Sequence, residues 1–207
     1  MTLSASRINF GATTLSMTEG GTDGWISTEI KGAMFDSIMD FRLATEQKMI
    51  PAERMAFRDQ TSAGVTFNLR NAEVGIYDIV SELPNGTQAT LPQGFHVIPG
   101  VQSNLGIKID APRVVHSGSH SPVSIAYANG GTNDIQIKGI LVRMQGAYLG
   151  KTVSDFKKAA TELYLVPEGY EPDRFGYISI PPGTQKVLNF FMEQHAGTSR
   201  MQVYIIK

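Results

Sequence analysis

The sequence predicts a mainly β protein, folded as a single antiparallel β-sandwich with one or two short helices. Three observations support this fold class. Short runs of alternating apolar and polar residues recur along the chain, as in half-buried strands. Turn signals separate these runs at intervals of roughly 8–15 residues, the spacing of a sandwich or barrel. The 207 residues include 21 glycines and only 18% charged residues, which is typical of β-rich proteins.

Residues 1–24 are predicted to be a flexible N-terminal arm. The segment is rich in Ser, Thr and Gly, nearly uncharged, and ends in EGGTDG, so it has too little apolar surface to order itself. Ile8, Phe10, Leu15 and Met17 are spaced to lie across a neighbouring subunit and to add backbone hydrogen bonds along a strand edge. A first strand around Arg7–Phe10 is the alternative.

Residues 25–60 are ambiguous. Apolar residues from Met34 to Phe41 have a spacing that suits a helix, whereas MDFRLAT alternates like a strand. Pro51 is placed to begin a short helical turn, since proline favours the first helical position.

From Gly64 onward, strands are predicted in chain order. GVTFNLR alternates as a half-buried strand, and residues 74–83 and 87–98 form a hairpin around Asn85-Gly86, because these two residues tolerate positive φ. LGIKIDA is the next strand. Residues 122–129 and 135–144 read as a second hairpin with GGTND as its turn, and three strands follow within residues 176–207.

One helix interrupts the predicted strands. Ser154 can cap it, Asp155 complements its positive end, and Phe156, Ala159, Ala160 and Leu163 form its apolar stripe. No Pro/Gly linker divides the chain, so residues 25–207 are expected to form one β-sandwich domain after the arm.

The segment VVHSGSH holds two of the four histidines, His116 and His120, four residues apart. Such a pair faces one way only on a helix, and Ser-Gly-Ser followed by Ser121-Pro122 is turn composition instead. We therefore expect a turn with solvated histidines and no metal or other cofactor. A metal site of His96, His116 and His120 is the alternative, with His195 as a further histidine.

Two other segments have compositions that suit a binding site. GAYLGKT, Gly146–Thr152, stands between a predicted strand and helix as a phosphate-binding loop would, but only three residues separate its glycines where that loop needs four. Glu168, Glu171 and Asp173 lie in an acidic, aromatic loop that suits a cation or sugar, or simply closes the sandwich. No GxSxG motif is present. The sequence thus predicts no enzyme.

Composition excludes several classes of function. The net charge is −1, with no basic run to neutralise phosphates, which argues against direct nucleic-acid binding. There is no cysteine, hence no thiolate metal site or disulfide. No apolar stretch approaches the roughly 18–20 residues of a membrane span, and the first residues do not read as a signal peptide. Synthesis in the cytoplasm of a host is expected.

The segments SPVSIAYANGGTNDIQIKGILVRM and GYISIPPGTQKVLNFFMEQHAGTSRMQVYIIK resemble the hairpins of viral and bacteriophage structural β-sandwiches. The resemblance covers residues 64–207 and lies in short strands, Gly/Asn/Thr turns and low charge. It implies a jelly-roll-like domain that builds a virion as a capsid, penton, cement, decoration, tail or fibre component. Its partners would be copies of itself, as a homo-oligomer, and other virion proteins. A carbohydrate- or ligand-binding sandwich, with the loops around His116–His120 and Glu168–Arg174 at one end, and a cupin-like metalloenzyme are the alternatives.

Overall fold

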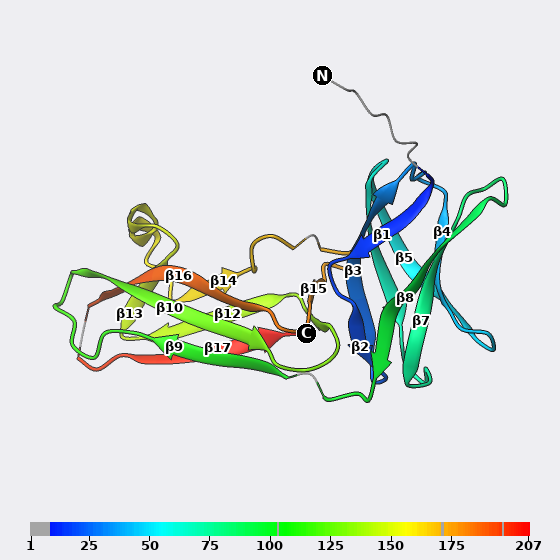
Figure 1. Ribbon diagram of the computed structural model, residues 1–207. Coiled ribbons are helices and arrows are strands. Elements are labelled where there is room, and N and C mark those ends of the chain that lie inside the picture. The colour runs from blue at the N-terminus through cyan, green and yellow to red at the C-terminus, as the bar shows by residue number, and fades with distance from the viewer. Residues whose placement is uncertain (1–8, 103, 171, 196) are drawn as a thin grey trace, which may run out of the picture. The chain divides into compact units, whose positions relative to one another are not determined.

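The chain is mainly β, as predicted, and it forms two compact units (Figure 1). The computed structural model describes residues 9–102, 104–170, 172–195 and 197–207, with the backbone alone for residues 157–158. The first unit contains residues 1–102 with 131–134, and the second contains residues 103–130 with 135–207. This division corrects the expected single domain of residues 25–207. Its physical basis is that the buried apolar side chains gather in two separate clusters, one in each unit.

The first unit is one curled sheet of eight strands, in the order β1-β3-β6-β5-β4-β7-β8-β2. Its neighbours pair antiparallel, except that β2 runs parallel to β8. Strand β1, at one end of the order, approaches β8, next to the other end: a Cβ atom on Gly11 would lie 2.6 Å from the Cβ of Ala89. The strands are β1 (Gly11–Leu15), β2 (Glu19–Gly21), β3 (Trp25–Ala33), β4 (Asp40–Ala44), β5 (Met49–Asp59), β6 (Ser62–Asn68), β7 (Gly75–Glu82) and β8 (Gln88–Ile98).

The predicted N-terminal arm is instead part of this sheet where the structure describes it. Strand β1 pairs with β3, β2 pairs with β8, and Phe10 and Leu15 pack against the hydrophobic cluster of the first unit. The backbone of Met17 exchanges two hydrogen bonds of 3.0 Å with the Thr28 hydroxyl. Ile8 lies outside the described residues. Few apolar side chains suffice here, since sheet pairing orders the segment.

Residues 25–60 are all strand or turn, so the helical interpretations are corrected. Met39, Phe41 and Leu43 are buried and the residues between them are not, which is the two-residue period of a strand. Pro51 lies inside β5, opposite Arg42, where pairing with β4 ends and pairing with β6 begins. A proline is tolerated at such a position because the ladder is interrupted there.

The Asn85-Gly86 hairpin is confirmed. Strands β7 and β8 pair up to Glu82 opposite Gln88, and the Gly86 N–H donates to the Leu83 carbonyl at 2.9 Å. Gly86 has a φ of 82°, and the Asn85 side chain accepts a hydrogen bond from the Thr87 N–H. A proline-led turn followed by a left-handed glycine is a common three-residue hairpin loop.

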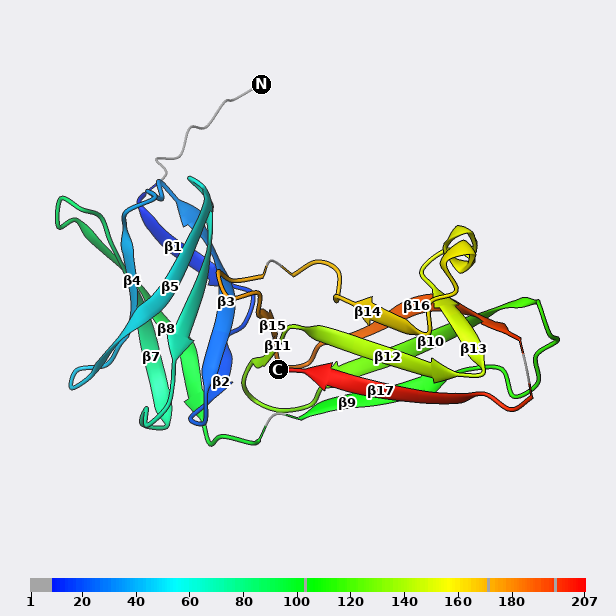
Figure 2. The ribbon, with the colours of Figure 1, turned by 180° about the vertical axis from the view of Figure 1, so that it is seen from behind.

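The second unit is a sandwich of two main sheets (Figure 2). One has the order β13-β16-β10-β9, the other β14-β12-β17, and β11 pairs with β15 separately. One hydrophobic cluster, with members from both sheets, forms the core. The strands are β9 (Leu105–Asp110), β10 (His120–Asn129), β11 (Ile135–Ile137), β12 (Gly139–Gln145), β13 (Ala147–Gly150), β14 (Glu162–Leu165), β15 (Ile178–Ile180), β16 (Gln185–Gln194) and β17 (Arg200–Ile206).

The predicted second hairpin does not form. Strand β10 pairs with β9 and β16, while β12 pairs with β14 and β17. Residues 131–134 of the predicted turn belong to the first unit, where the Thr132 carbonyl accepts a hydrogen bond from the Gly21 N–H and the Asp134 N–H donates to the Trp25 carbonyl. Hydrogen bonds to β2 and β3 therefore hold a segment whose composition suggested a local turn.

The predicted helix is only the 3₁₀ helix η1 (Val153–Lys158). Thr152, rather than Ser154, is its N-cap, and the Thr152 N–H donates to the Asp155 carboxylate at 2.8 Å. Ala159 ends it in a left-handed conformation, and Leu163 lies in strand β14. The apolar spacing suggested a longer helix, but residues 162–165 pair with β12 instead.

Candidate functional site: edges and outer face of the second unit

The four-stranded sheet of the second unit carries the surface features best suited to binding. Val123, Ile125 and Tyr127 of β10 are buried, so Ser124, Ala126 and Ala128, which alternate with them, face outward. The register places Lys108 and Val187 beside Ala126, and Asp110 and Asn189 beside Ser124. The outer face is therefore a row of small side chains along β10, flanked by larger ones from β9 and β16.

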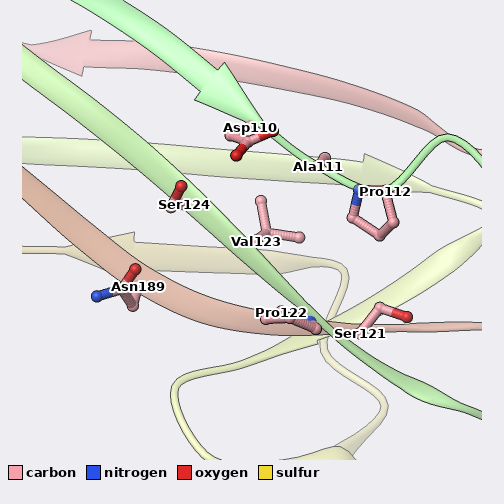
Figure 3. Close-up of a pocket in the computed structure, with 8 residues that line it drawn as sticks. All are labelled: Asp110, Ala111, Pro112, Ser121, Pro122, Val123, Ser124 and Asn189. Carbon is pink, nitrogen blue, oxygen red and sulfur yellow. The ribbon is translucent and has the colours of Figure 1, made fainter.

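Two shallow hollows follow this row. One, of about 400 Å³, lies over Ser124 between Asn189 and the segment Asp110–Pro112 (Figure 3). The other, of about 550 Å³, lies over Ala126 and Ala128 and is bordered by Lys108 and Val187. Val187 is 55% exposed. The outer face thus offers apolar surface at one end and polar groups at the other.

Strand β9 is the free edge of the same sheet. Within the described part of the chain it pairs with β10 alone, so its other side presents unpaired backbone groups. Ile109 is 42% exposed at this edge, and its neighbours Lys108 and Asp110 are exposed charges on the outer face. An edge with an uncovered isoleucine between opposite charges can accept a further strand.

The segment His116–Ser119 is a turn, as predicted. The Ser119 N–H and hydroxyl both donate to the His116 carbonyl, and Gly118 has a φ of 76°. His120 begins strand β10, where its Nε2 lies 3.2 Å from Glu193 Oε2 and its ring stacks on Phe156 at a centroid distance of 4.5 Å. The prediction that His120 is a loop histidine is therefore wrong: it lies in a strand, and an acidic and an aromatic neighbour hold its ring.

The remaining histidines lie elsewhere. His195 Nδ1 is 3.1 Å from the Gly146 carbonyl oxygen, and its ring contacts Tyr148 at 4.1 Å. His96 lies on β8 of the first unit, while His116 and His120 belong to the second. Among residues 9–102, 104–170, 172–195 and 197–207, no group of three or more His, Cys, Asp or Glu side chains is placed to hold a metal ion.

The loops around His116–His120 and Glu168–Arg174 do not converge, which corrects the predicted ligand site. The Gly118 N–H donates to the carbonyl of Gln194, at one end of β16, whereas the Glu168 carbonyl accepts from Lys186, near the other end. Eight strand residues separate these contacts by roughly 26 Å. Asp173 is used within its own loop, accepting hydrogen bonds from the N–H groups of Phe175 and Tyr177. Glu171 lies outside the described residues.

The segment Gly146–Thr152 is not a phosphate-binding loop. Residues 147–150 form strand β13, which pairs with Gln194–Phe191 of β16. Their backbone groups are committed to a sheet, so they cannot form the nest of N–H groups that holds a phosphate.

Two buried polar groups, the Asp134 carboxylate and the Tyr127 hydroxyl, were not anticipated from the sequence. Asp134 packs beside β3, where burial raises the pKa of its carboxyl group to about 6 although the nearby Ser27 lowers it. Neither carboxylate oxygen has a hydrogen-bond partner. The Tyr127 side chain is 2% exposed, and its hydroxyl is buried without a hydrogen-bond partner. Asp134 sits in turn-like sequence and Tyr127 in an ordinary strand pattern, so no local signal marked either one.

No protein-family model matches this chain, and no curated protein matches it. Within the described residues, no helix is both long and apolar enough to cross a bilayer.

Proposed function

We propose that this protein is structural and acts through protein–protein assembly rather than catalysis, pairing with copies of itself and with other proteins. The observation that carries the proposal is the free edge of β9, with Ile109 exposed between Lys108 and Asp110. A virion, with the chain as a capsid, penton, cement, decoration, tail or fibre component, is the assembly that the sequence resemblance favours. That part of the proposal rests on the resemblance alone.

The residues of β9 support self-pairing in one particular register. When two copies of β9 run antiparallel with Ile109 opposite Ile109, each Lys108 lies opposite an Asp110 of the second copy. Centring the pair on Lys108 or on Asp110 would set like charges opposite each other, and a shift by one residue would turn the outer face inward. Two ion pairs and one isoleucine pair contribute roughly 0.2–1 kcal/mol each, beside the backbone hydrogen bonds.

Charge reversal tests this register directly. Lys108→Asp and Asp110→Lys each place like charges in both contacts, so each variant alone should sediment as a monomer at concentrations where the unmodified chain forms dimers. An equimolar mixture of the two variants restores both ion pairs, so dimers should return. Lys31→Asp, on the exposed side of β3 in the first unit, is the control and should leave the dimer unchanged.

A chain that stays monomeric at every concentration, or a mixture that fails to dimerise, would show that β9 is not an assembly edge. The virion as the place of assembly needs a separate test. Antibodies raised against the purified protein should label intact particles, and an absence of the chain from purified particles would contradict that part.

A further inference from the structure

The four-stranded sheet has a second unpaired edge, along part of β16 and on the opposite side from β9. Strand β13 pairs with Phe191–Gln194 and ends at Gly150, where the chain turns away into η1. A Cβ atom on Gly150 would lie 2.9 Å from the Thr152 carbonyl oxygen, so this turn is tight. Residues 185–190 consequently pair with β10 on one side, and no described strand pairs with them on the other.

A hollow lies along this open edge. It measures about 480 Å³ and is bordered by residues from both sheets and from the segment after β13: Tyr127, Lys151, Leu165, Val166, Glu168, Lys186, Val187, Leu188 and Asn189. Its volume lies within the range of ligand-binding pockets. We name the hollow and the adjoining edge of β16, residues 185–190, the β16 slot.

Tyr127 gives the β16 slot an unmet hydrogen-bonding demand. Its hydroxyl is buried and has no partner, whereas buried tyrosine hydroxyls usually find one. Burial is the main cause that raises the pKa of Tyr127 to about 12; the charge of Tyr170, a hydrogen-bonding interaction with its side chain, and the charge of Glu168 add to it. The interaction with Tyr170 falls outside the geometry of a hydrogen bond, so the Tyr127 hydroxyl keeps its capacity to donate. The phenol therefore keeps its proton at neutral pH and can donate to an acceptor.

Positive charge predominates among the residues that border the slot. Two lysines, Lys151 and Lys186, stand against one carboxylate, Glu168. Lys186 is held in place, because its Nζ donates to the Glu168 carbonyl at 3.0 Å and lies 4.3 Å from the centre of the Tyr170 ring. The slot therefore suits an anionic acceptor group.

We propose that the β16 slot binds an extended segment of a partner protein, which adds as an antiparallel strand beside residues 185–190 and directs one Asp or Glu side chain toward Tyr127 and the two lysines. The unpaired backbone favours a strand over a small molecule, because strand addition satisfies a row of N–H and C=O groups at once. The carboxylate supplies the acceptor that the phenol lacks and complements the lysines.

The test uses the full chain and fluorescein-labelled eight-residue peptides that alternate valine and threonine and carry one central glutamate, glutamine or lysine. The glutamate peptide should bind, and the lysine peptide should bind at least tenfold more weakly. Hydrogen exchange should slow within residues 185–190 on binding. Equal binding of the glutamate and lysine peptides would overturn the proposal. So would unchanged hydrogen exchange in residues 185–190, or free glutarate that saturates the site and gives the same protection.

Tyr127→Phe is the decisive variant, because it removes only the hydroxyl. It should lower the affinity for the glutamate peptide about tenfold and leave the affinity for the lysine peptide unchanged. The melting temperature of the free chain should stay the same or rise. Tyr204→Phe, on β17 of the other sheet, is the matched control and should bind like the unmodified chain. A fall in melting temperature with unchanged peptide binding would show that the hydroxyl serves stability, and would also overturn the proposal.

Discussion

Replacing Asp134 with asparagine should stabilise the first unit at neutral pH. The carboxyl group is buried beside Trp25 and Ser27, and burial raises its pKa from an ordinary 3.8 to about 6. The folded state therefore holds this proton more tightly than the unfolded state does. Stability from this group is fully present below about pH 4 and is lost as the pH rises through 6. Asparagine has nearly the same shape and carries no charge to bury.

The size of the effect follows from the shift in pKa. A rise from 3.8 to about 6 corresponds to about 3 kcal/mol of unfolding free energy, at about 1.36 kcal/mol per unit. The difference between Asp134→Asn and the unmodified chain should thus be small near pH 4, grow between pH 4 and 6, and level off near 3 kcal/mol above that range. Other carboxylates cancel in this comparison because both proteins contain them.

Urea unfolding measured at several pH values provides the assay. Trp25 is the sole tryptophan of the chain and lies in the first unit, so its fluorescence reports that unit's unfolding. Asp40→Asn, at an exposed carboxylate that begins β4, is the control and should give no comparable pH-dependent gain. A stability difference for Asp134→Asn that is constant from pH 4 to 8, or a loss at pH 7, would refute the reasoning.

Two further predictions concern the first unit. Gly86→Val should cost about 1–2 kcal/mol of unfolding free energy, since valine must adopt a φ of 82° although its Cβ meets nothing within 4 Å. Gly75→Val in the same hairpin is the control, because its Cβ also points into open space but its φ is not left-handed. If urea unfolding shows nearly equal losses of unfolding free energy for the two variants, the cost at Gly86 is not conformational. A chain that starts at Trp25 lacks β1 and β2 and should lose the cooperative unfolding of the first unit. Trp25 fluorescence would show this, and a normal transition would mean that both strands are dispensable.

Local features of the sequence were enough to predict the β class, many of the strands and one turn. Leu105, Ile107 and Ile109 alternate with Gly106 and Lys108, and they form strand β9 as expected. Asn85-Gly86 forms the predicted turn because its requirement for positive φ is met by the glycine itself. The His116–Ser119 turn was predictable for the same reason: Ser and Gly determine a local conformation without help from distant residues.

Strand pairing and the candidate sites depended on contacts between residues far apart in the chain. Alternation shows which side of β10 is buried, but not that its partner is β16, more than 50 residues later, rather than the adjacent β12. For the same reason, alternation did not indicate the two separate cores, the packing of residues 131–134 in the first unit, or the strand pairing within residues 11–21.

The two buried polar groups also depend on contacts between residues far apart in the chain. Asp134 has an unusual pKa, and the Tyr127 hydroxyl lacks a partner, only because distant strands remove both from water. The sequence by itself determined where the chain extends and where it turns. Only the tertiary structure decided which extended segments meet, because burial and strand register are properties of pairs of segments, not of either segment alone.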